Sequence, residues 1–189
     1  YFIAKSMFAQ PELLSNQNPN PIHVPKEHIE QWVVQALGVS PVGAGSYPVD
    51  VISKEGWGAD VKMLSCGVKD DELDSSESGE TSLSQKFTGT GSDLDTLFLD
   101  KKYEEIINGF KEIYYQKMSG VIKEKNLSEI YYFFILRAEL KFYLCGMQIN
   151  IDNVKNIKYL RNTAQNVWTR NFMDSKYGSI RIYKAKKRM

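Results

Sequence analysis

Two aspartates and one lysine in the first third of the chain are the residues whose types and spacing best fit a chemical role. Asp50 follows Pro48-Val49, and the triplet Asp60-Val61-Lys62 begins ten positions further on. Both runs are rich in residues typical of strands, and a glycine-containing stretch at 54–58 separates them, which predicts a β-hairpin. Residues i and i+2 of a strand point to one face, so Asp60 and Lys62 project together and the hairpin can bring Asp50 beside them.

Two carboxylates that converge on one point repel each other unless a hard cation lies between them. Mg²⁺ suits such a pair because it takes oxygen ligands, keeps several waters and is completed by a substrate phosphate. A lysine at the rim can orient or help to deprotonate a metal-bound water for in-line attack on phosphorus. The alternative is structural: Asp50 would cap a turn, and Asp60 and Lys62 would form a same-face ion pair worth at most about 1 kcal/mol at the surface.

An acid-x-Lys triplet has little weight by itself. Four such triplets occur, at 60–62, 100–102, 139–141 and 174–176, where about two are expected from the composition. The context favours Asp60-Val61-Lys62, because it follows a Pro-x-Asp run on a predicted paired strand. Glu139-Leu-Lys141 also lies in a strand-like run and is the main rival, but it has no such run upstream.

Apolar spacing and turn residues predict the elements that hold these residues. Residues 1–24 form an N-terminal arm rich in proline and asparagine, and 67–82 form an acidic, solvated loop. A helix with one apolar stripe is expected over 25–37, between Pro25 and Gly38, from residues that recur at helical spacing. These residues are Ile29, Trp32, Val33, Ala36 and Leu37.

The second half of the chain adds helices and strands in alternation. A helix is expected over 92–118 with Ser92 or Asp93 as its cap, and two strands within 130–151, whose first half also fits a buried helix. A second amphipathic helix is expected over 153–172 and a terminal strand over 179–184. This order predicts a single α/β or α+β domain over 25–189, with a central mixed β-sheet flanked by helices.

The net charge of +1, from 24 basic and 23 acidic residues, hides a strong polarity along the chain. Segment 155–189 holds ten basic residues against Asp174 alone, while 67–82 holds six acids against Lys69. Aromatic residues are interleaved with the bases, which favours a nucleic-acid-binding face over a solvated basic tail. These aromatic residues are Tyr159, Trp168, Tyr177 and Tyr183.

Other features exclude several classes of protein. Cys66 and Cys145 lie far apart and are not part of a CxxC motif, so free thiols are expected rather than a disulfide framework or a zinc site. No apolar run reaches the roughly 18 residues of a membrane span, and the first residues lack the pattern of a secretory signal. A cytoplasmic protein without membrane association is therefore expected.

Residues 26–66 resemble the PD-(D/E)XK phosphodiesterase superfamily, which contains most type II restriction endonucleases and the archaeal Holliday-junction resolvases. A helix, a glycine-rich strand, Pro48-Val49-Asp50 and Asp60-Val61-Lys62 follow the family's order, with Pro-Val-Asp standing where the pattern has Pro-Asp. The resemblance implies a restriction-endonuclease-like fold in which Asp50, Asp60 and the Val61 carbonyl bind Mg²⁺ and Lys62 serves the attacking water. It also implies a glutamate from the first helix, and Glu30 matches this arrangement better than Glu27.

The function implied by the resemblance is that of a type II restriction enzyme, which hydrolyses double-stranded DNA at specific sequences to give 5′-phosphates. Since each chain would carry one site, cleavage of both strands predicts a homodimer on a palindromic target. Two alternatives stay open: a structure-specific resolvase or repair nuclease, and a non-catalytic DNA-binding module in which the aspartates and the lysine are structural. Base reading would fall to the C-terminal basic segment, through Arg161, Arg170, Lys176 and Arg181.

Overall fold

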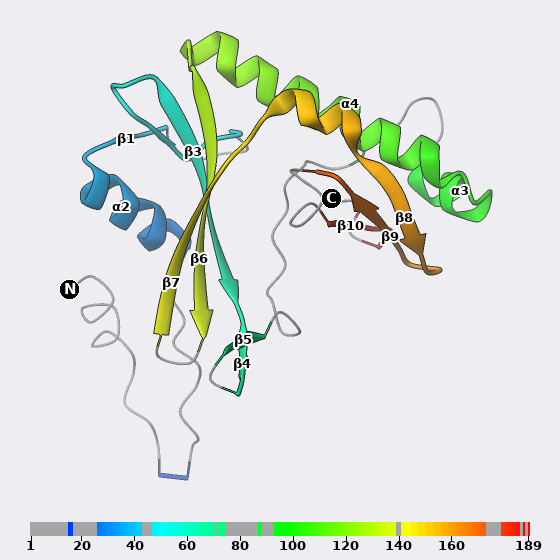
Figure 1. The fold of residues 1–189 in the computed structure, drawn as a ribbon, viewed down its shortest axis with the longest axis horizontal. Coiled ribbons are helices and arrows are strands. Elements are labelled where there is room, and N and C mark those ends of the chain that lie inside the picture. Colours follow the sequence, from blue (N-terminus) through cyan, green and yellow to red (C-terminus); the bar gives the residue numbers. More distant parts are fainter. Residues whose placement is uncertain are drawn as a thin grey trace. The chain divides into compact units, whose positions relative to one another are not determined.

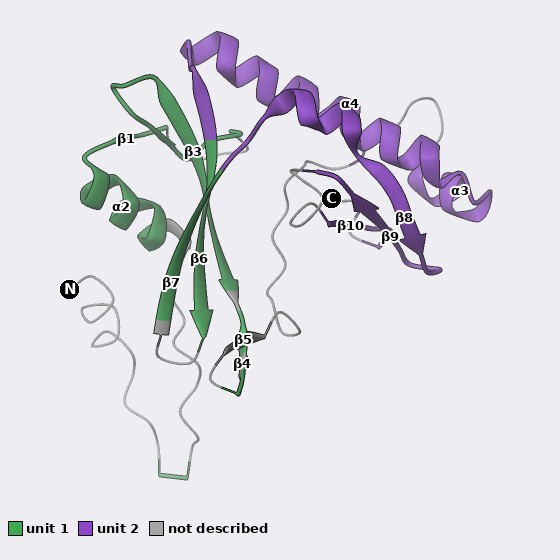
Figure 2. Ribbon diagram, in the orientation of Figure 1, with its two compact units in different colours: residues 1–81, 131–147 green, residues 82–130, 148–189 purple. Residues whose placement is uncertain are grey.

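The chain forms two compact units, each built from two stretches of sequence (Figure 2). In the computed structural model of the chain, the described residues are 15–16, 26–42, 47–70, 72–74, 87, 93–138, 141–172, 179–185, 187 and 189. Unit 1 comprises residues 1–81 and 131–147, and unit 2 comprises residues 82–130 and 148–189. The domain predicted over 25–189 thus consists of two units, and the predicted arm lies outside the described residues except for 15–16.

Unit 1 is organised around a five-stranded sheet with the strand order β1-β2-β3-β6-β7 (Figure 1). Helix α2 comes first, and a short antiparallel hairpin, β4 with β5, follows β3. The elements are α2 (Lys26–Leu37), β1 (Ser40–Pro41), β2 (Val51–Ile52), β3 (Trp57–Ser65), β4 (Gly67–Lys69), β5 (Glu72–Asp74), β6 (Glu129–Ala138) and β7 (Lys141–Gln148).

The hairpin of β2 and β3 is the element that positions the candidate residues. The two strands pair antiparallel, with Val51 opposite Ala59 and Ile52 opposite Gly58. The turn closes by a hydrogen bond from the Ser53 N–H to the Trp57 carbonyl, 2.8 Å long. Gly56 has a φ of +88° in this turn, a conformation that favours glycine. The predicted hairpin is therefore confirmed, and a glycine at the turn is one reason for its register.

Helix α2 packs on one face of this sheet, as its apolar stripe predicts. Ile29 and Val33 of α2 join Val51, Ala59 and Val61 in one buried cluster. Because neighbouring residues on a strand point to opposite faces, burial of Ala59 and Val61 against α2 sends Asp60 and Lys62 to the other face. The helix thus fixes the orientation of β3 and, with it, the side of the sheet on which the candidate residues lie.

Unit 2 combines two helices with a three-stranded antiparallel sheet of order β10-β9-β8. Its long helix buries one side along its length, and Tyr114 on that side contacts Phe172 edge to face, with 5.4 Å between ring centres. The elements are α3 (Leu94–Leu99), α4 (Tyr103–Lys125), the 3₁₀ helix η2 (Ile151–Asn156), β8 (Lys158–Asn162), β9 (Asn166–Arg170) and β10 (Ile180–Tyr183).

The helix expected over 92–118 is two helices. Asp93 caps α3 as predicted, since its carboxylate accepts hydrogen bonds from the backbone N–H groups of Asp95 and Thr96. Lys101 then adopts a φ of +57°, which no helix interior allows, and α4 begins at Tyr103. Leu97 of α3 and Ile106 of α4 are both buried. The apolar residues that predicted one helix are therefore divided between two helices.

The amphipathic helix expected over 153–172 was a wrong prediction. After η2 this stretch forms β8 and β9, joined by a turn in which Thr163 Oγ1 accepts hydrogen bonds from the N–H groups of Gln165 and Asn166. Val167 and Thr169 are fully buried, which is the two-residue period of a strand, and both are β-branched. The expected loop over 67–82 was also wrong over β4 and β5, while 75–82 lies outside the described residues.

The predicted fold class is confirmed: the chain is a mixed α/β protein with a five-stranded mixed sheet and a separate three-stranded antiparallel sheet. The strands expected over 47–53, 59–66, 130–151 and 179–184 correspond to β2, β3, β6 with β7, and β10. None of the helices in the described part of the chain has the length and apolar character required to cross a membrane.

Two glycines of α4 provide a matched test of packing in unit 2. A Cβ on Gly109 would lie 2.5 Å from Cε2 of Phe87, whose ring packs on Phe110, whereas a Cβ on Gly120 meets nothing within 4 Å. We expect Gly120→Ala to raise the free energy of unfolding by about 0.5–1 kcal/mol through helix propensity. Gly109→Ala is expected to lower it by about 1 kcal/mol, because overpacking outweighs that gain. Urea unfolding measures both, and equal stabilisation by the two variants would contradict the packing described.

Candidate active site

The β2–β3 hairpin brings Asp50 and Asp60 together. Asp50 lies just before β2, and its N–H donates to the Ala59 carbonyl at 2.8 Å. Its carboxylate Oδ2 accepts the N–H of Val61 at 2.7 Å, so the side chain replaces a backbone acceptor at the end of the ladder. This hydrogen bond holds Asp50 against β3 beside Asp60, and the nearby Asp50 carboxylate contributes to the raised pKa of Asp60. The predicted juxtaposition of the two aspartates is present.

Asp60 is a buried acid with only 3% of its surface exposed. Burial raises the pKa of Asp60 from 3.8 to about 7; the Lys62 ammonium opposes this shift, and the Asp50 carboxylate adds to it. Burial is the main cause because a carboxylate loses hydration when it leaves water. A carboxyl group that titrates near neutral pH beside a second carboxyl group is typical of functional sites.

Lys62 contacts Asp60 directly. Its Nζ lies 2.5 Å from Asp60 Oδ1, and its side chain is 13% exposed. The ammonium supplies the positive charge that a buried carboxylate requires. The i, i+2 spacing on β3 explains the contact, since both residues point to the face opposite α2.

The oxygen atoms at this site suit a hard divalent cation, but the side chains supply only part of its ligands. Asp50 and Asp60 offer two carboxylates, and the Val61 carbonyl is the third predicted ligand. Among the described residues, no three His, Cys, Asp or Glu side chains are grouped closely enough to hold one metal ion. A Mg²⁺ ion here would therefore be completed by backbone, water and substrate oxygens, as is common for this ion.

The helix glutamate predicted to join the site does not join the two aspartates in a group of three. Glu30 lies on α2 next to Ile29, which packs on the Val61 face of the sheet. Asp60 and Lys62 point to the opposite face, so the backbone of the sheet separates that helix face from their side chains. The side chain of the other candidate, Glu27, lies outside the described residues.

The predicted DNA-binding residues lie in unit 2. Arg161, Arg170 and Arg181 are exposed, on β8, β9 and β10 respectively, while Lys176 lies outside the described residues. Arg161 and Arg181 lie opposite Trp168 in the sheet register. Their guanidinium carbons are 4.5 Å and 5.0 Å from the centre of the Trp168 ring, a cation–π arrangement worth about 0.5–1 kcal/mol per pair at an exposed site.

Sequence reasoning did not single out Lys158 or pair Trp168 with particular arginines. Lys158 lies opposite Arg170 at the start of β8, so it belongs to the same basic face. The strand period of Asn166–Arg170 is the signal that reveals this face, because it places Trp168 and Arg170 on one side and Val167 and Thr169 on the other. The prediction of a helix over the same residues obscured it.

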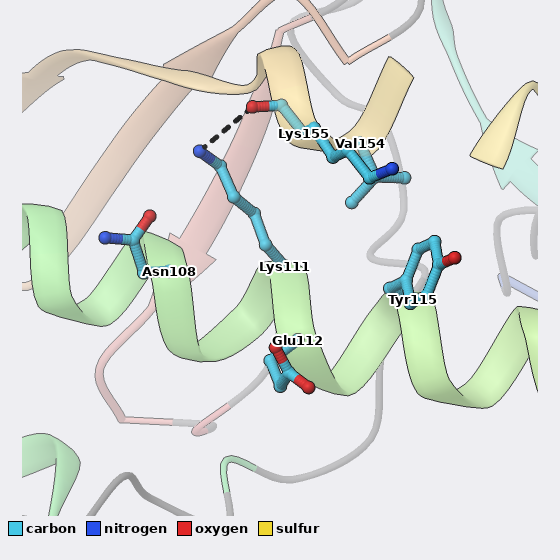
Figure 3. A pocket seen from close by; sticks show the side chains of 6 residues that line it. All are labelled: Asn108, Lys111, Glu112, Tyr115, Val154 and Lys155. Carbon is cyan, nitrogen blue, oxygen red and sulfur yellow. Dashed lines mark hydrogen bonds between the residues drawn. The ribbon is translucent and has the colours of Figure 1, made fainter. Parts of the chain in front are cut away.

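A hollow of about 510 Å³ lies elsewhere in unit 2, between α4 and η2 (Figure 3). Lys111 Nζ donates to the Lys155 carbonyl at 3.4 Å, and Lys155 Nζ forms an ion pair with Asp152 at 3.2 Å. The side chain of Glu112 also lines it. Because the hollow is open and contains neither Asp50 nor Asp60, it is not part of the candidate active site.

Comparison of the chain with protein-family models, with curated proteins and with solved structures finds no match. The function of the site therefore has to be inferred from its own residues and their geometry.

Proposed function

We propose that this chain is a Mg²⁺-dependent endonuclease of double-stranded DNA with a PD-(D/E)XK-type site. The observation that carries the proposal is the arrangement of Asp50, Asp60 and Lys62 on one hairpin. Two carboxyl groups lie side by side, one of them buried, with a lysine in direct contact. This set matches the order and spacing of the superfamily motif in the sequence, and its parts are adjacent in space.

Each residue of the hairpin has a role in this proposal. Asp50 and Asp60 would hold Mg²⁺, with the Val61 carbonyl as a further ligand. When bound, Mg²⁺ supplies Lewis-acid polarisation of a phosphate and a more acidic water. Through its 2.5 Å contact Lys62 partly opposes the rise in the pKa of Asp60, and it would orient the attacking water toward phosphorus. The Asp50 carboxylate accepts a hydrogen bond from the Val61 N–H, which fixes its position relative to β3 and Asp60.

DNA as substrate is supported by the basic face of unit 2, whose arginines are exposed and stand among aromatic rings. Polyanions bind such a face and release counterions. The products would carry 5′-phosphates, as the superfamily resemblance implies. With one Asp50–Asp60–Lys62 set per chain, cleavage of both strands would require two copies, and a two-fold homodimer fits a palindromic target.

One observation favours a second candidate, a non-catalytic DNA-binding module. Asp60 and Lys62 are nearly buried, and a buried ion pair of this kind can serve to specify packing alone. Asp50 is the more exposed of the two acids, so its carboxylate would be the one in contact with solvent. In the binding module these residues hold the hairpin, and only the basic face of unit 2 meets DNA.

Digestion of supercoiled plasmid by the full chain separates the two candidates. The nuclease is expected to convert the plasmid to nicked and linear forms with Mg²⁺ and to stop in EDTA. Its ends should religate without kinase treatment, because they carry 5′-phosphates. Salt-dependent DNA binding with an intact plasmid in both Mg²⁺ and Mn²⁺ would contradict the nuclease and support the binding module.

A further inference from the structure

The outward face of the three-stranded sheet in unit 2 is basic and aromatic. Val167, Thr169, Ile180 and Ile182 are buried on its inner side, with exposed fractions of 8% or less. The residues that alternate with them, together with two basic residues of β8, form what we call the basic sheet face. It consists of Lys158, Arg161, Trp168, Arg170, Arg181 and Tyr183.

The charge of this face is entirely of one sign. The strands β8, β9 and β10 contain four cations and no aspartate or glutamate within their bounds. Arg161, Arg170 and Arg181 are exposed, and none of them is offset by an acid on these strands. A sheet face of this kind attracts a polyanion, and its affinity should fall steeply with salt.

The two central arginines are held by Trp168. Arg161 comes from β8 and Arg181 from β10, the strands on either side of β9, and both lie opposite Trp168. Arg181 also lies 5.4 Å from the centre of the Tyr183 ring. A guanidinium stacked on a ring keeps its N–H groups directed outward in a fixed fork, the geometry that matches phosphate oxygens.

The same stacking leaves the Trp168 ring poorly available to a nucleobase. Proteins that hold single strands offer open aromatic faces on which bases stack, whereas here two guanidinium groups approach the ring from its neighbouring strands. The donors that remain are the outer edges of the arginines. They suit backbone phosphates, which position DNA without reading its sequence.

We infer that the basic sheet face binds the phosphate backbone of duplex DNA independently of sequence, with Arg161 and Arg181 as the contacts and Trp168 as the residue that positions them. This inference takes DNA as the partner from the proposed function. It changes the role expected for these arginines from base reading to backbone contact. Sequence recognition, where it exists, then has to come from other residues.

The test measures binding of the full chain, in EDTA so that no cleavage occurs, to two labelled duplexes of unrelated sequence over a range of salt. Arg161→Gln with Arg181→Gln is expected to raise Kd about tenfold or more and equally for both duplexes. The slope of log K against log salt should become shallower by about 1.8, or about 0.9 for each phosphate that the variant no longer neutralises. Lys123→Gln with Lys125→Gln, an equal loss of charge at the exposed end of α4, should leave the slope unchanged.

Trp168 is tested by two variants of the same chain. Trp168→Leu is expected to raise Kd about threefold to tenfold for both duplexes, and Trp168→Phe, which keeps an aromatic face, should restore most of the affinity. Both should melt at temperatures close to that of the unaltered chain, because the ring is on the outer side of the sheet. A loss that Trp168→Phe does not restore would contradict the positioning role.

Three results would overturn the inference. Unequal losses on the two duplexes would show base reading, unchanged binding would show that the face does not touch DNA, and tighter binding to an RNA duplex of the same length would assign another partner. These outcomes are separate from failure of the nuclease proposal. If the chain binds as expected but cuts no plasmid, the inference about the basic sheet face stands and the nuclease proposal fails. If the chain cuts plasmid while its arginine variants bind normally, the inference fails and the nuclease proposal stands.

Discussion

Asp60→Asn is expected to reduce Mg²⁺-dependent plasmid cleavage roughly 10³-fold, the scale of loss when a charge-stabilising group leaves an active site. Asparagine has nearly the same shape, and its carbonyl oxygen can still accept a hydrogen bond from the Lys62 ammonium. It cannot supply the second negative charge beside Asp50 that a divalent cation requires. Nicking rates measured under single-turnover conditions with Mg²⁺ report the effect.

Asp100→Asn is the matched control for this experiment. Asp100 and Lys102 form the same acid-x-Lys triplet as Asp60 and Lys62, but they lie at the exposed junction of α3 and α4. Cleavage by Asp100→Asn should equal that of the unaltered chain. Lys62→Met should lose cleavage roughly 10²-fold or more, as expected for a group that assists the attacking water. Normal cleavage by Asp60→Asn would remove Asp60 from the site.

The stability of the metal-free chain is expected to fall as the pH rises from about 4 to about 7. The pKa of Asp60 is about 7 in the folded chain against 3.8 for the ordinary group, so between these values the folded state binds the proton more tightly than the unfolded state does. Stability from this group is complete below pH 4 and is lost as the pH passes through 7. The shift corresponds to a loss of roughly 4 kcal/mol. Urea unfolding in EDTA at several pH values measures it.

Asp60→Asn tests the origin of this pH dependence, because its side chain stays neutral. The variant should unfold at nearly the same urea concentration from pH 4 to pH 8, and at pH 8 it should be more stable than the unaltered chain. Asp93 acts in the opposite direction: hydrogen bonds from Thr96 lower its pKa, so its contribution is lost only as the pH falls below about 4. Equal pH profiles for Asp60→Asn and the unaltered chain would contradict burial of an ionisable Asp60.

Local patterns were enough to predict α2, the β2–β3 hairpin and the pairing of Asp50, Asp60 and Lys62. The apolar spacing of Ile29 and Val33 predicted α2 correctly because both residues lie on the one helix face that is buried against the sheet. The hairpin was predictable because a glycine-containing turn separates two strand-rich runs, and Gly56 in that turn has a positive φ in the structure. The i, i+2 spacing on β3 then placed Asp60 and Lys62 together, since a strand has a fixed two-residue period.

Long-range pairing decided what local patterns left open. Residues 158–170 fit a helix by apolar spacing, but they form strands because β9 has β8 and β10 on either side and buries Val167 and Thr169. Similarly, Glu30 has the spacing expected of a ligand on the first helix. Among the described residues Glu30 does not join Asp50 and Asp60 in a group of three acids, and only the arrangement of helix and sheet shows this.

The mixed α/β class, the residue types of the candidate site and the concentration of positive charge at 155–189 were predictable from the chain, because they follow from composition and short periods. The burial of Asp60, and therefore its pKa near 7, required the folded structure, since desolvation depends on every element packed around the group. The position of Trp168 between Arg161 and Arg181 also required the folded structure, because the pairing of β9 with both β8 and β10 sets these residues opposite each other.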